Sequence, residues 1–405
     1  MRLRGGRNLQ ESIGLVPAVA AGAGEEEERM RIGMGRWGAL VLLGLGLAGT
    51  AQAEASPYGT VEALERVLDR LQSSDEPEPL GDGPVLRKGD RSDAVRRLED
   101  RLAWLGDFDG SPDARFDADT EQAVRRFQGR HGLKVDGLVG PETRSALGRT
   151  KQDRIARLKK NLEARRSFER PKGSFVLVNV PDFELHVLGP DVEPLSMRVA
   201  VGKEGWGTPP ITDRIERVVI NPAWNVPASI VAADLAPKVA RNPGYLAEKN
   251  MVVLDGWGEG ASRIDPSTID WGSVTEGNQS FHVRQQRGPQ NPLGRIKFLF
   301  PNQAHIFLHD TPHRSLFVRQ ERDGSHGCIR VEAPFQLADL VLAGTDGWDR
   351  GRVEEVVDSG ERATVALASP FPVRVVYWTA WVDEDGTLHE REDLYDGIAP
   401  TEKPV

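Results

Sequence analysis

Two short stretches, "HIFLHD" (His305–Asp310) and "SHGCIR" (Ser325–Arg330), decide how the C-terminal half of this chain is interpreted. The first has the alternating apolar pattern of a β-strand that is buried on one face. The second contains Cys328, the only cysteine of the chain. A histidine at the end of a strand and a thiol after a polar loop can meet when their strands lie side by side. The pattern predicts a compact β-fold built around this pair.

The chemistry of a thiol explains the pairing. An unperturbed cysteine has a pKa of about 8.5 and is a poor nucleophile until a base removes its proton. We interpret His309 as that base, and as the acid that later protonates a leaving amine. Gly327 permits a sharp turn, so that its amide and that of Cys328 can face a developing oxyanion. Asp310 can orient the imidazole through either its main-chain carbonyl or its carboxylate.

Other interpretations of these residues were weighed. A lone cysteine can also be a small buried apolar residue, and cysteine usage alone does not decide between the two. His326 lies next to the thiol, but adjacent residues of a strand or turn point apart, which favours His309 as the base. His305, His309 and His313 would align as metal ligands only on a helix. Because the stretch reads as a strand, we expect no metal and no cofactor.

Strands also surround this pair. "SFVLVNVPDFELHVL", "LSMRVAVG" and "ITDRIERVVINP" alternate between apolar and polar residues, as in a β-meander that begins near Ser174. Residues 227–274 read as a mixed α/β insertion that caps the site, and strands return in "FHVRQQRGPQNPLGRIKFLFPN" and "AHIFLHD". We therefore predict a mainly β catalytic unit at 173–395. Trp257, in "DGWGEG" of the insertion, is a candidate substrate contact, although packing is the commoner role of such a residue.

The N-terminal half predicts a small all-α domain at 84–149. A cap near Ser92 begins a helix with a 3.6-residue apolar stripe, a second helix begins at Asp117 or Asp119, and a third begins at Pro141. Residues 54–83 read as a short helix and an acidic, Pro- and Gly-rich linker. Residues 150–172 read as a basic helical connector with a solvated charged face, and residues 396–405 as a tail.

The first 53 residues contain "MRIGMGRWGALVLLGLGLAGTAQA", with a basic start, an apolar run and a small-x-small end. This is the pattern of a secretory signal with cleavage after Ala53, and we expect the true start at Met30 or Met34. The apolar run falls short of the roughly 20 residues of a membrane span. We expect an exported protein of the periplasm or cell wall with no stable span after cleavage. A net charge of −9 without a long basic tract argues against nucleic-acid binding.

Both units resemble known families. The segments "LRKGDRSDAV" and "GLKVDGLVGPETRSAL" resemble the three-helix peptidoglycan-binding domain of exported cell-wall enzymes. "HDTPHRSLFVRQERDGSHGCIR" resembles the signature of the L,D-transpeptidase catalytic domain. "RQQRGPQNPLGRIKFLFPN" and "YWTAWVDEDGTLHEREDLY" resemble its larger periplasmic subgroup, whose members carry a capping insertion. The resemblance implies docking to the wall by the first unit and catalysis by the second.

The resemblance also implies roles for single residues. Cys328 would be the nucleophile, His309 the general base and acid, and Asp310 the orienting residue, in the family usually through its carbonyl. The oxyanion site and its turn would be formed by Ser325, His326 and Gly327. Arg330 stands where many members have asparagine. It would either bind a stem-peptide carboxylate or form a structural salt bridge.

The implied reaction is acyl transfer on peptidoglycan. Cys328 would attack the L-centre carbonyl of a stem tetrapeptide and release the terminal D-amino acid. The thioester would then pass to the amine of another stem, a protein or a D-amino acid. The insertion would limit access of water, as a lid does. A cysteine carboxypeptidase or endopeptidase and a non-catalytic wall-binding protein are the alternatives. Expected partners are stem peptides and glycan, together with regulatory wall-synthesis proteins; a role in cell shape and sensitivity to carbapenems are also implied.

Overall fold

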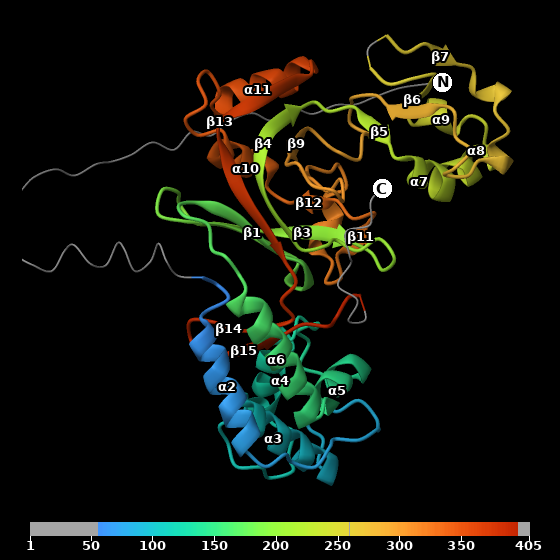
Figure 1. Cartoon of the computed structure of the whole chain (residues 1–405). Helices are drawn as coiled ribbons and strands as arrows, with labels where there is room; N and C mark the ends of the chain where they lie inside the picture. Colours follow the sequence, from blue (N-terminus) through green and yellow to red (C-terminus); the bar gives the residue numbers. More distant parts are fainter. Residues whose placement is uncertain (1–55, 259, 396–405) are drawn as a thin grey trace, which may run out of the picture. The chain divides into compact units, whose positions relative to one another are not determined.

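The computed structural model describes residues 56–395 apart from Glu259 (Figure 1). The predicted signal, its cleavage site and the tail at 396–405 lie outside this range. Within it, no helix has the length and apolar character needed to cross a membrane. The described part contains the predicted helical domain, followed by a mainly β catalytic domain with an insertion, so the predicted fold class is confirmed.

Three helices of the N-terminal domain begin at the N-cap residues that the sequence predicts. Ser92 accepts a hydrogen bond from the backbone of the helix it precedes, and so does Asp117, while Pro141 occupies the first turn of a third helix. Apolar stripes from these three helices form one core. The helices are α2 (Val61–Ser73), α3 (Asp93–Leu105), α4 (Ala118–Arg130), α5 (Pro141–Gly148) and α6 (Lys151–Arg166).

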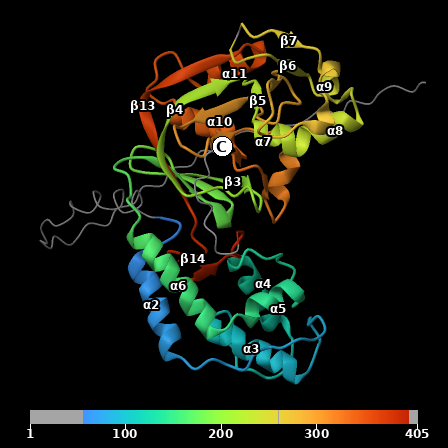
Figure 2. The ribbon, with the colours of Figure 1, turned by 45° about the vertical axis from the view of Figure 1, so that its right-hand side comes forward.

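Helix α6 exposes charged residues such as Lys159 and Lys160 on one face, but its other face is buried. Its Arg154 is fully buried and forms an ion pair with Glu390, which is also fully buried. Glu390 ends β15 (Leu388–Glu390), the partner of β14 (Ala380–Val382). This hairpin packs with α2 and α6 in a shared apolar cluster (Figure 2). The helical domain therefore includes a C-terminal hairpin that sequence-local patterns do not assign to it.

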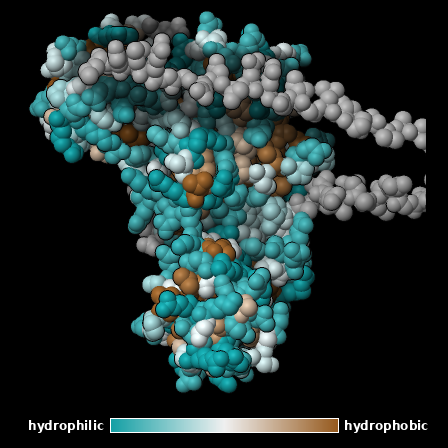
Figure 3. All heavy atoms as spheres, turned by 180° about the vertical axis from the view of Figure 1, so that it is seen from behind, coloured by the Kyte–Doolittle hydropathy of each residue, from teal (hydrophilic) through white to brown (hydrophobic). Residues whose placement is uncertain are grey.

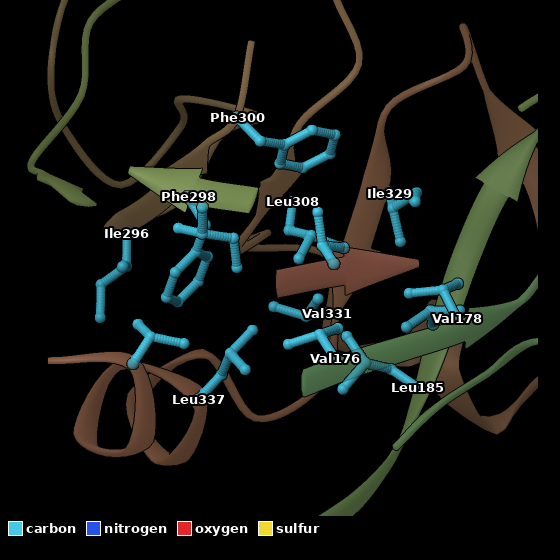
Figure 4. Packing of buried hydrophobic residues seen from close by; sticks show 14 of the residues in the cluster. Val176, Val178, Leu185, Ile296, Phe298, Phe300, Leu308, Ile329, Val331 and Leu337 are labelled. Carbon is cyan, nitrogen blue, oxygen red and sulfur yellow. The ribbon is translucent and has the colours of Figure 1, made fainter. Parts of the chain in front are cut away.

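The catalytic sheet has the strand order β11-β3-β12-β10-β9-β4-β13-β1-β2, and β2 also pairs with β3. The sheet therefore closes on itself, and its interior is filled by alternate residues such as Ile296, Phe298 and Leu308 (Figure 4). Helices α10 (Pro334–Val341) and α11 (Arg350–Ser359) contribute to the same core. The strands are β1 (Phe175–Asn179), β2 (Glu184–Leu188), β3 (Leu195–Gly202), β4 (Ile211–Ile220), β9 (Ile296–Leu299), β10 (Leu308–His309), β11 (Asp323–Ser325), β12 (Ile329–Val331) and β13 (Ala363–Val376), with the short helices η1 (Val180–Asp182) and η5 (Arg314–Val318).

The insertion is larger than the predicted 227–274 and has its own sheet, in the order β5-β8-β6-β7. The strand expected in "FHVRQQ" forms, but it belongs to the sheet of the insertion, because Phe281 and Val283 pack into the core of the insertion. Its elements are β5 (Trp224–Val226), α7 (Ala228–Ile230), η2 (Val231–Leu235), α8 (Ala236–Arg241), α9 (Tyr245–Glu248), β6 (Met251–Leu254), β7 (Arg263–Ile264), η3 (Pro266–Thr268), η4 (Trp271–Ser273) and β8 (His282–Gln285).

The strand predicted over "HIFLHD" is much shorter in the structure. Only Leu308 and His309 form β10, and His305 adopts a left-handed backbone with φ of +52°.

The face of the molecule seen in Figure 3 is mostly hydrophilic, with small, separated apolar patches.

Candidate active site

Strand register gathers the candidate catalytic residues on one face of the sheet. His309 of β10 lies opposite Lys297 of β9 on one side and opposite Arg330 of β12 on the other. Residues opposite each other in a ladder project from the same face, so these three side chains form a row. Cys328 precedes Arg330 by two residues and continues the same alternation. We call Lys297, His309, Arg330 and Cys328 the catalytic row.

The imidazole of His309 is buried, and its Nδ1 lies 2.5 Å from the main-chain oxygen of Asp310. A carbonyl only accepts, so Nδ1 donates the hydrogen bond and Nε2 keeps its lone pair. Of the two orienting routes left open by the sequence, the structure has the carbonyl. The Asp310 carboxylate instead accepts from the Arg295 amide at 2.9 Å and from the Arg314 guanidinium at 3.3 Å.

Electrostatics keep His309 neutral. Burial lowers its pKa to about 3, and the positive charges of Arg330 and Lys297 act in the same direction, while the Asp310 carbonyl opposes them. The resting imidazole can therefore accept a proton at Nε2 at neutral pH.

The turn that carries Cys328 depends on Gly327, whose φ is +106°. This backbone conformation strains any residue with a side chain, and a Cβ here would also lie 2.8 Å from Ile306 Cδ1, which would have to move. The hydroxyl of Ser325 donates to the Cys328 carbonyl at 2.6 Å and accepts from the Gly327 amide at 3.1 Å. Thr208 donates to the Gly327 carbonyl at 2.7 Å. Ser325 and Gly327 thus shape the turn, and the Gly327 amide donates its hydrogen bond to Ser325.

The thiol of Cys328 is partly exposed, and its sulfur lies 4.0 Å from the main-chain oxygen of His305. Burial raises its pKa to about 11, while the Phe307 amide and the charges of Lys297 and Arg330 oppose this increase. With His309 also neutral, the two groups rest as a thiol and an imidazole.

His326 faces the insertion. Its Nε2 lies 3.0 Å from Asp234 Oδ2 on η2, at ion-pair distance but outside hydrogen-bond alignment, and its ring packs edge-on to Trp206. Burial lowers the pKa of His326, and Asp234 raises it. This histidine therefore connects the cysteine turn to the insertion, and it is not part of the catalytic row.

The two candidate substrate-binding residues, Arg330 and Trp257, lie in different parts of the structure. Arg330 belongs to the row, and its buried Nε has no hydrogen-bond partner in the described part of the chain. None of the ion pairs found among the described residues includes it, so its two predicted roles stay predictions. Trp257 is 62% exposed, and its ring packs on His282 of the insertion. No contact found among the described residues joins it to the row.

Lys297 is the residue that sequence reasoning missed. In "GRIKFLF" it is the polar residue between the core residues Ile296 and Phe298, and this alternation was the available signal. The sequence did not predict that His309 lies opposite it in the β-ladder. The described residues contain no group of three or more side chains suited to hold a metal ion.

Two family models match the chain. Residues 173–357 match the L,D-transpeptidase catalytic domain (YkuD), and residues 91–147 match the family described as "Putative peptidoglycan binding domain".

Individual proteins match parts of it. A "Putative L,D-transpeptidase" of Haemophilus influenzae is 37% identical over 220 residues, which cover 54% of this chain and 44% of that protein. The N-acetylmuramoyl-L-alanine amidase CwlM of Mycobacterium tuberculosis is 43% identical over 76 residues, 16% of this chain and 19% of that protein. The chain thus spans less than half the length of these curated relatives. The crystal structure of an L,D-transpeptidase from Stackebrandtia nassauensis aligns with 75% of this chain and 97% of its own, at 15% identity and a TM-score of 0.25, too low to support an argument.

Proposed function

Since residues 173–357 are an L,D-transpeptidase (YkuD) catalytic domain and residues 91–147 a peptidoglycan-binding domain, we propose that Cys328 is the nucleophile of a peptidoglycan L,D-transpeptidase. The observation that carries this proposal is the catalytic row. It combines the lone thiol with a neutral imidazole whose Nδ1 is held by a carbonyl and whose Nε2 is free to take a proton.

The reaction then has two halves. The thiol proton passes to His309 Nε2, and the sulfur attacks the L-centre carbonyl of a stem tetrapeptide. The tetrahedral intermediate collapses to a thioester as His309 returns the proton to the departing D-amino acid. In the second half, an acceptor amine attacks the thioester, His309 takes the amine proton, and the sulfur leaves with a proton from His309. No other reactant is required.

The proposed substrate indicates where the protein acts and which role each of its two domains has. Peptidoglycan lies outside the cytoplasmic membrane, so the protein acts in the periplasm or the cell wall. The helical unit at 84–149 docks to the glycan, and the unit at 173–395 performs the transfer. The acceptor is a second stem, a protein or a free D-amino acid, and each of these supplies the same nucleophilic amine.

The test is the intact mass of the protein after brief exposure to a disaccharide-tetrapeptide, beside Cys328→Ala. We expect an adduct equal to the donor minus its terminal D-amino acid, and none in the variant. A variant that still cleaves the peptide would refute Cys328 as the nucleophile. Addition of an acceptor amine then separates the classes, because a transpeptidase forms the amide product, whereas a carboxypeptidase or endopeptidase delivers the acyl group to water in either condition.

A further inference from the structure

Lys297 is a cation at the centre of the site without an anionic partner. It lies on β9 directly opposite His309, on the face that points away from the barrel core. Its ammonium sits 3.6 Å from the centroid of the Phe307 ring. None of the ion pairs or hydrogen bonds of the described chain involves its side chain. A partly buried ammonium normally has a carboxylate within reach, so this arrangement needs a reason.

The charged and ionisable groups around Lys297 come from segments beyond the two strands, β4 and β10, that adjoin β9. Arg330 of β12 and Cys328, just before that strand, face it across the imidazole of His309, and Arg362 faces it from the segment before β13. The cysteine is the one group among them that becomes negative during acyl transfer. Burial lowers the pKa of Lys297 to about 8, and Cys328 acts in the opposite direction. The ammonium therefore gains stability when the thiol ionises.

We propose that Lys297 is a positioning residue that acts through Cys328, because its unpaired ammonium stabilises the thiolate when the proton moves to His309. The proposal rests on Cys328 being the nucleophile of the proposed function. His309 alone does not supply this stabilisation, because the imidazolium that forms lies between two cations, Lys297 and Arg330, and is disfavoured by both. The stabilising positive charge therefore comes from Lys297 and Arg330, the two cations of the row.

The experiment measures the ionisation of Cys328 directly. Because it is the only cysteine, alkylation by iodoacetamide followed by intact mass reports on this thiol alone. The rate is measured from pH 6 to pH 11 for the full chain, for Lys297→Met and for Lys297→Arg. Arg217→Met serves as the matched control, because Arg217 is an exposed cation on the neighbouring strand β4, opposite Leu299 and on the same face as Lys297.

We expect Lys297→Met to lower the alkylation rate by about tenfold below pH 8, where Lys297, with its pKa of about 8, is protonated, and by less at higher pH, where its charge is lost. Lys297→Arg should recover most of the rate, since it keeps the charge, and Arg217→Met should match the unmodified protein. The thermal unfolding midpoint of each variant is measured as well, to show whether the variant is folded. If Lys297→Met unfolds, Lys297→Gln takes its place, because it keeps a polar side chain of similar length.

An unchanged profile in a folded Lys297→Met protein would overturn the proposal. So would a Lys297→Arg protein as slow as Lys297→Met, because the side chain would then act through packing. Alkylation needs no peptidoglycan. Failure of the acyl-enzyme test therefore refutes the proposed function without changing the alkylation profile, and the two failures are distinguishable.

Discussion

Two regions of the molecule bury positive charge, and they treat it in opposite ways. Between the helical domain and the β14–β15 hairpin, buried Arg154 is paired with Glu390, and buried Arg130 is paired with Asp107. In the catalytic row, Lys297 and Arg330 have no carboxylate partner among the described residues. A paired buried charge is satisfied in the folded state, whereas an unpaired one remains available to an anion that forms later.

The first region is a network of paired charges, although Arg154 Nε and Glu390 Oε1 have no hydrogen-bond partner among the described residues. Glu390 is fully buried and also lies 3.1 Å from His131 Nε2, whose other ring nitrogen lies 2.9 Å from the Phe127 carbonyl. Burial alone would raise the pKa of Glu390, but Arg154 and His131 hold it far below its usual range. Burial lowers the pKa of His131 to about 3, and the hydrogen bond and charge of Glu390 act in the opposite direction. In this network each buried cation has a carboxylate partner, in contrast to the catalytic row.

The largest effect is expected when the row loses its base. In His309→Gln the thiol has no acceptor for its proton, and the two cations remain. We expect the rate of acyl-enzyme formation to fall by about 10³-fold, in the range of general-base catalysis, with little change in unfolding free energy. Rapid-quench mass measurements of the thioester test this. A fall of less than tenfold would assign the base elsewhere, and His326 would be the next candidate.

A large loss of stability is expected when the network loses its carboxylate. Glu390→Gln leaves Arg154 buried without a counter-charge, which typically costs about 3–5 kcal/mol. Urea unfolding measures the free energy. The matched control is Glu392→Gln, two residues along the chain, because Glu392 is 59% exposed and pairs with Arg149 at the surface. Such surface pairs contribute about 0–1 kcal/mol. Equal losses in both variants would contradict the contrast drawn between the two regions.

A smaller effect is expected from acid. The folded pKa of His131 lies below its unfolded value of 6.5, so the unfolded state binds more protons and stability falls as pH drops below 6.5 toward about 3. The folded pKa of Glu390 is also depressed, so its contribution is present above 4.5 and is lost below it. The titrations of His131 and Glu390 therefore both lower the stability as the pH falls. We expect the thermal midpoint to fall from pH 7 to pH 4, and to fall less in His131→Gln, which removes one of the two titrations.

Local patterns predicted much of the fold and part of the site. Caps such as Ser92 and Asp117 are local, because a side chain meets a backbone amide two or three residues away. The cysteine turn is also local, since Ser325, Gly327 and Cys328 contact one another within four residues. Strand membership was less predictable. Phe281 and Val283 read as strand in either sheet, and only packing assigned them to the insertion.

The sequence by itself determined the two domains, the single thiol and the histidine at the end of its strand, because these depend on short-range periodicity and on residue chemistry. Only the tertiary structure decided that Lys297 and Arg330 lie on either side of His309, because ladder register joins strands that are separated in the chain. It also decided that Arg154 is buried against Glu390, 236 residues later. The charge of a lysine or an arginine is written in the sequence, but whether a carboxylate neutralises it depends on which distant segments the fold brings together.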